Sequence, residues 1–124
     1  MLTRIAKHAA NTFVLMAAIA GSSAAFAHAH LKSTAPAQDS TAPAPEVLKL
    51  AFSEGIEAKF SSVALTRDGT AVELKGIATA PGDNKVLLVT PAQPLAKGQY
   101  QVQWHVISVD THKSEGAYRF TVGN

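Results

Sequence analysis

The stretch Tyr100-Gln-Val-Gln-Trp-His-Val-Ile107 decides the fold. Apolar side chains occupy every second position of it, at Tyr100, Val102, Trp104 and Val106. Successive side chains of an extended chain point to opposite faces, so this alternation is typical of a β-strand with one buried face. The pattern predicts a central strand whose apolar face anchors the core.

Working outward from this strand, the same alternation or a short apolar run recurs in five other segments. We expect strands at residues 48–52, 60–66, 71–75, 86–89 and 118–122. Turn residues separate them, notably Asp68-Gly69, the run 81–84 and the connection 94–98. Residues 35–45, rich in Pro, Ala, Ser and Thr, are expected to form an irregular surface connection. About seven short strands predict a Greek-key β-sandwich or barrel, and strand count alone leaves immunoglobulin-like and cupredoxin-like topologies open.

The first 27 residues have the organisation of a cleaved signal peptide. Arg4 and Lys7 precede an apolar run at 13–20, and Ala25-Phe26-Ala27 provides the A-x-A pattern that a signal peptidase accepts. The run is shorter than the roughly 20 apolar residues that span a bilayer. We therefore expect export to the periplasm and one mature domain over residues 28–124.

Charge and cysteine content exclude several functions. Removal of Arg4 and Lys7 leaves nine basic and nine acidic residues in 28–124, which does not favour nucleic-acid binding. The chain has no cysteine, so disulfides, thiolate metal sites and cysteine nucleophiles are excluded. Stability must come from packing, which favours a well-packed sandwich over a loop-rich scaffold.

Two features of the mature sequence point to a metal ion. Cleavage after Ala27 would give His28 a free α-amine beside its imidazole, so that one residue offers two nitrogen ligands. Asp110-Thr-His112 places a carboxylate and an imidazole on the same side of an extended segment. Three nitrogens and one oxygen suit tetragonal Cu(II), whereas Zn(II) prefers a tetrahedral arrangement of the same ligands.

Other interpretations of these histidines stay open. The amine, two backbone amides and His30 could bind Cu(II) in the N-terminal tripeptide alone, which would leave Asp110 and His112 idle. The folded site is favoured because ionising those amides would pull the first strand out of its sheet. The histidines could also be incidental to a structural domain, and we expect a structural role for His105.

The sequence from residue 28 onward resembles the CopC family of periplasmic copper-resistance proteins. The matching segments are residues 28–31, 51–54 and, most specifically, 100–120. The resemblance implies a cupredoxin-like Greek-key barrel with one Cu(II) per chain in a histidine-brace site. The implied ligands are the amine and imidazole of His28, with Asp110 and His112, and the resemblance implies that Glu54 is a hydrogen-bond partner of the amine or a weak extra ligand. His30 points to the same side of the chain as His28 and is expected beside the ion as a weak ligand or a partner of the ligands.

The resemblance also carries expectations about partners and about departures from the family pattern. It implies a role in copper sequestration, homeostasis or resistance and a CopD-like inner-membrane transporter as partner. We expect a monomer without enzymatic activity, the alternative being a histidine-brace copper oxidase or monooxygenase. Both methionines lie in the signal peptide, so the Met-rich Cu(I) loop of many relatives is missing. Thr111 and His105 stand where relatives usually have Gly and often have Arg.

Overall fold

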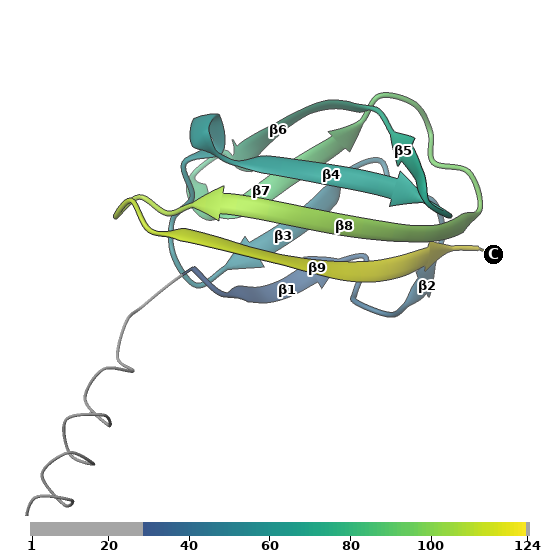
Figure 1. The fold of residues 1–124 in the computed structure, drawn as a ribbon, viewed down its shortest axis with the longest axis horizontal. Helices are drawn as coiled ribbons and strands as arrows, with labels where there is room; N and C mark the ends of the chain where they lie inside the picture. The colour runs from purple at the N-terminus through teal and green to yellow at the C-terminus, as the bar shows by residue number, and fades with distance from the viewer. Residues whose placement is uncertain (1–28, 124) are drawn as a thin grey trace, which may run out of the picture.

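The computed structural model describes residues 29–123, which form two facing β-sheets (Figure 1). One sheet has the strand order β1-β3-β7-β6 and the other has the order β2-β9-β8-β4-β5. All pairings are antiparallel except that of β2 with β9. Within the described residues the nine strands are β1 (Leu31–Ala35), β2 (Thr41–Ala42), β3 (Leu48–Phe52), β4 (Ser62–Arg67), β5 (Thr70–Val72), β6 (Leu74–Ala80), β7 (Asp83–Pro91), β8 (Gly98–Ile107) and β9 (Lys113–Val122). The predicted all-β sandwich is confirmed.

The core lies between the two sheets and follows the alternation in the sequence. On β8, Tyr100, Val102, Trp104 and Val106 are all buried, as the pattern predicts. Leu48, Leu50 and Phe52 face them from β3, together with residues of β7 and β9. Phe52 and Trp104 meet edge to face across the core, with ring centroids 5.2 Å apart. Because burying one large apolar side chain contributes about 1.5–3 kcal/mol, this layer can stabilise a small domain without disulfides.

The structure corrects the prediction at several elements. The supposed irregular connection at 35–45 contains β2 and the last residue of β1. The strand predicted at 60–66 begins at Ser62, because residues 58–60 form the 3₁₀ turn η2 (Ala58–Phe60) and leave Phe60 exposed. The segment 71–75 is divided between β5 and β6, which pair in different sheets. β6 was not expected to continue to Ala80, since Ile77 is the one large apolar residue in 76–80 and the others are small.

One end of the sandwich gathers several segments that are distant in sequence. In Figure 1 the β8–β9 loop, the start of β1, the end of β3 and the η2 turn all lie at the left end. The chain between β3 and η2 bonds directly to the β8–β9 loop, since Val109 N donates to Gly55 O at 2.9 Å. Over residues 29–123 no helix has the length and hydropathy needed to cross a bilayer.

Candidate metal centre

The β8–β9 loop brings Asp110 and His112 together. His112 Nδ1 lies 3.1 Å from Asp110 Oδ2, and both side chains are about half exposed, at 49% and 46%. Two donors about 2.0–2.2 Å from one ion and at right angles to each other would be roughly 2.8–3.1 Å apart. The two atoms are therefore spaced like adjacent ligands of one ion, and solvent can reach them.

The loop is closed by main-chain hydrogen bonds rather than by an extended conformation. Ser108 N donates to His112 O at 3.0 Å, and Thr111 N donates to Ser108 O at 2.8 Å. Thr111 has a φ of 73°, in the left-handed region, which turns the chain between the two candidate ligands. The expectation that Asp110 and His112 converge is met, but a tight turn brings them together and not the alternation of a strand.

Ser108 is fully buried beneath this turn and binds the candidate ligands from below. Its hydroxyl donates to Asp110 Oδ1 and lies 3.3 Å from His112 N. The Ser108 hydroxyl, followed by hydrogen bonding to His112, holds the pKa of the Asp110 carboxyl below its ordinary value. Both contacts favour the ionised carboxylate, which is the form that binds a cation.

The start of the described chain is docked against the same end of the sandwich. Ala29 is buried, and its carbonyl accepts a hydrogen bond of 2.9 Å from Ser114 Oγ on β9. His30 N donates to Ser53 Oγ at 2.9 Å, and Ser53 N donates to His30 O at 2.8 Å. Ser114 is two residues beyond His112, so the chain enters β1 beside the candidate ligands.

The predicted ligand His28 lies outside the described residues, and its assignment stays a prediction. Glu54 is half-buried at the end of β3, beside the Gly55 carbonyl that Val109 binds. The side chain of His30 is exposed. Within residues 29–123 no three His, Asp or Glu side chains are close enough to hold an ion together. On their own Asp110 and His112 offer two donors, so an ion bound there would need further donors from elsewhere.

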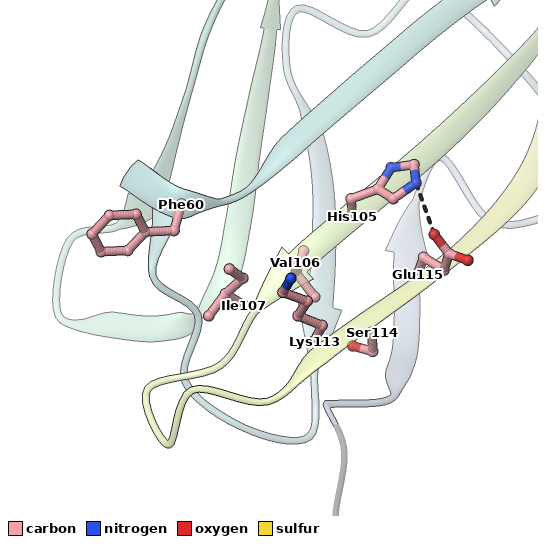
Figure 2. A pocket seen from close by; sticks show the side chains of 7 residues that line it. All are labelled: Phe60, His105, Val106, Ile107, Lys113, Ser114 and Glu115. Atoms are coloured by element: carbon pink, nitrogen blue, oxygen red, sulfur yellow. Dashed lines mark ion pairs between the residues drawn. The ribbon is translucent and has the colours of Figure 1, made fainter.

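His105 lies apart from this pair, on the outer face of β8. Its Nε2 is 2.8 Å from Glu115 Oε2 on β9, directly opposite in the strand register. Figure 2 shows this ion pair at the side of a surface hollow of about 540 Å³ that Phe60 and Lys113 also line. His105 therefore faces solvent, on the opposite face of β8 from the buried Trp104.

Ser108 and Ser114 are not among the site residues that the sequence predicts. Trp104, Val106 and Ser108 occupy alternate positions that are all buried. Ser108 therefore has a hydroxyl at a position where the alternation predicts an apolar side chain. That mismatch was the available signal for Ser108. Ser114 gave no signal, because its contact with Ala29 spans 85 positions of sequence.

The fold and the loop define a small two-sheet β-sandwich with an Asp–His pair at one end. A family model described as CopC domain matches residues 31–123, and the chain belongs to this family. Copper resistance protein C of Escherichia coli is 41% identical over 109 residues, covering 79% of this chain and 83% of that protein. Copper resistance protein C of Xanthomonas campestris pv. juglandis is 34% identical over 119 residues, covering 91% and 94%.

Two solved structures of the family have the same architecture. PcoC, described as a methionine-rich copper resistance protein from E. coli, matches with a TM-score of 0.71 and 41% identity, over 78% of this chain and all of that one. CopC from Methylosinus trichosporium OB3b matches with a TM-score of 0.70 and 32% identity, over 77% and 93%. These matches identify the chain as a member of a copper-resistance family.

Proposed function

We propose that this protein is a periplasmic Cu(II)-binding protein that takes part in copper resistance by sequestering or delivering one copper ion. The observation that carries the proposal is the convergence of Asp110 and His112 at the end of the sandwich where Ala29 is docked. Copper here is the cargo of the protein, and the proposed activity is reversible binding rather than catalysis.

Signal cleavage before His28 would complete the site. Consecutive Cα atoms of a chain are about 3.8 Å apart, so residue 28 joins directly to the docked Ala29. The Ser114 hydroxyl donates to the Ala29 carbonyl, and His112 lies only two residues before Ser114 in the chain. The amine and imidazole of His28 are then the donors that the half-exposed Asp110–His112 pair lacks. Copper binding would depend on export, since the precursor has no free amine at this position.

The donor set favours Cu(II) over Cu(I). Three nitrogens and one carboxylate oxygen suit a tetragonal Cu(II) ion, which binds such ligands more tightly than the other divalent first-row metals do. Cu(I) prefers thiolates and thioethers, and residues 28–124 contain neither Cys nor Met. The E. coli relative is described as methionine rich, so this chain differs from it in the ligands available for Cu(I).

The packing of the first residues argues against the rival tripeptide site. That site needs the deprotonated amides of Ala29 and His30 as copper ligands. His30 N is already engaged with Ser53 Oγ, and the Ala29 side chain is buried in the core. Copper bound in this way would have to break the hydrogen bond from His30 N to Ser53 Oγ, just before β1, which the folded site leaves intact.

The arrangement of aromatic residues supports binding rather than polysaccharide oxidation. A histidine-brace enzyme acting on a polysaccharide needs an exposed platform, which is often aromatic. Among the described residues Phe60 is exposed, whereas the other aromatic side chains are buried: Phe52, Tyr100, Trp104, Tyr118 and Phe120. Cleavage of a polysaccharide by the copper-loaded protein with a reductant and peroxide would contradict the non-enzymatic function.

The deciding experiment is a Cu(II) titration followed by EPR on secreted protein whose first residue is shown by mass to be His28. We expect one equivalent to bind tightly. The same binding mode should be lost in His112→Ala and in a form with one extra residue before His28. If His112→Ala binds as the parent does and His30→Ala does not, the ion occupies the tripeptide and the proposed site is wrong.

Delivery to a membrane protein is tested separately. We propose that the copper-loaded monomer passes its ion to a CopD-like transporter of the inner membrane. A pull-down with such a transporter should retain the copper-loaded chain, and size-exclusion chromatography with light scattering should report a monomer. Failure of the transporter to retain the chain would leave sequestration as the function.

A further inference from the structure

The buried hydroxyl of Ser108 donates a hydrogen bond to the side chain of a candidate ligand, Asp110. Ser108 directly follows β8 and continues the alternation that buries Trp104 and Val106. None of its surface is exposed. A buried hydroxyl needs a hydrogen-bond partner, because an unpaired one costs free energy. Instead of bonding only to neighbouring main chain, this hydroxyl reaches the carboxylate of Asp110.

The hydroxyl has one proton and several acceptors within reach. His112 O lies 3.3 Å away, whereas Asp110 Oδ1 is the closer acceptor and carries charge. A charge-assisted hydrogen bond is stronger than a neutral one, so the proton goes to the carboxylate. The oxygen of the same hydroxyl can then accept from His112 N, 3.3 Å away. Ser108 therefore links the two candidate ligands from inside the fold.

The two oxygens of the Asp110 carboxylate have different partners. Oδ1 is held by Ser108 and also lies 3.4 Å from His112 N. Oδ2 is not bonded to Ser108 and lies 3.1 Å from His112 Nδ1. Rotation of the carboxylate would break the bond to Ser108, so Oδ2 is kept beside His112 Nδ1.

We propose that Ser108 is a positioning residue for copper, whose hydroxyl fixes Asp110 so that Oδ2 and the His112 imidazole meet the ion as adjacent ligands. The proposal rests on the proposed function, since it assigns a role in that same Cu(II) site. Residues that orient metal ligands through hydrogen bonds typically change metal affinity about 10–100-fold when removed.

The test compares Ser108→Ala with Ser61→Ala as a matched control. Ser61 also carries a hydroxyl bonded at the end of β8, where it accepts from Ile107 N at 3.1 Å, and it donates to Glu57 O at 2.8 Å. Both variants lose a hydroxyl beside the same strand, and only Ser108 touches Asp110. Each is purified with His28 as its first residue, and Cu(II) affinity is measured by competition with a chelator of known affinity.

We expect Ser108→Ala to weaken Cu(II) binding about 10–100-fold and to change the EPR parameters, while Ser61→Ala keeps both. Because Ser108 acts through the carboxylate, Ser108→Ala should add little in an Asp110→Ala background. Parental affinity and EPR parameters in Ser108→Ala would overturn the proposal. An equally large loss on top of Asp110→Ala would also overturn it, since that result indicates a general structural role.

Two further arms keep the test decisive. If Ser108→Ala alone does not fold, the same comparison is made in a Thr111→Gly background, where a glycine accepts the positive φ and Thr111→Gly alone is the reference. His112→Ala separates the two proposals. Loss of binding in His112→Ala with none in Ser108→Ala refutes only the role of Ser108, whereas parental binding in His112→Ala refutes the site itself.

Discussion

At the scale of single residues, the β8–β9 turn contains a conformation that its side chain disfavours. Thr111 has a φ of 73° and is β-branched, so its Cβ crowds the main chain. Such strain costs on the order of 1–3 kcal/mol. A glycine at this position would relieve the strain, but part of the gain would be offset because glycine loses more conformational entropy on folding.

We expect Thr111→Gly to raise the free energy of unfolding by about 1 kcal/mol, measured by urea denaturation of the metal-free protein. The control is Thr70→Gly, an exposed strand position on β5 with no positive φ, where the same change should destabilise. A lower stability for Thr111→Gly than for the parent would show that the turn is not strained.

A second residue-scale prediction concerns the close approach of β9 to the indole of β8. A Cβ on Gly116 would lie 2.5 Å from Trp104 Cζ2, and the buried ring cannot move aside freely. Gly116→Ala should therefore lower the free energy of unfolding by about 1–3 kcal/mol. Gly76→Ala on β6 meets nothing within 4 Å and should change stability by less than about 0.5 kcal/mol. Equal thermal midpoints for the two variants would refute this explanation.

At the scale of elements, the chain just before β1 is held by a contact with β9. The Ser114 hydroxyl holds the Ala29 carbonyl, and Ala29 directly follows the proposed ligand His28. Ser114→Ala should weaken Cu(II) binding roughly tenfold by loosening this residue, while the exposed Ser62→Ala on β4 should have no effect. Chelator competition measures both. Unchanged affinity in Ser114→Ala would mean that the other contacts of β1 suffice to dock the chain.

At the scale of the whole molecule, the proposed site joins segments from the two ends of the domain. Copper bound to both the new N-terminus and the β8–β9 loop would exist only in the folded state and would stabilise it. At a free copper concentration of 100 times Kd, the gain is about 2.7 kcal/mol. Calorimetry should show a higher Tm with Cu(II) in the parent and a much smaller rise in the form extended before His28. An equal rise in both would place the ion away from the N-terminus.

Much of the core could be predicted because its signal is local. The alternation in residues 100–107 and in 48–52 reflects a period that every strand with one buried face must have, whatever its neighbours are. The small residues of β6 and the two-residue β2 lack that period, since their place in a sheet comes from partners elsewhere in the chain. The prediction of a strand from residue 60 was wrong at its start, because Phe60 belongs to η2 although it is large and apolar like a strand residue.

The sequence by itself determined the all-β class, the reliance on packing without cysteine, and the donor types available to a metal ion. It also placed Asp110 and His112 two residues apart, so their side chains begin close together whatever the local conformation. Only the tertiary structure decided that Ser108 lies beneath this pair and that Ala29 docks beside it. The reason is physical: contacts such as that of Ser114 with Ala29, 85 positions apart, depend on how two sheets pack and on strand register.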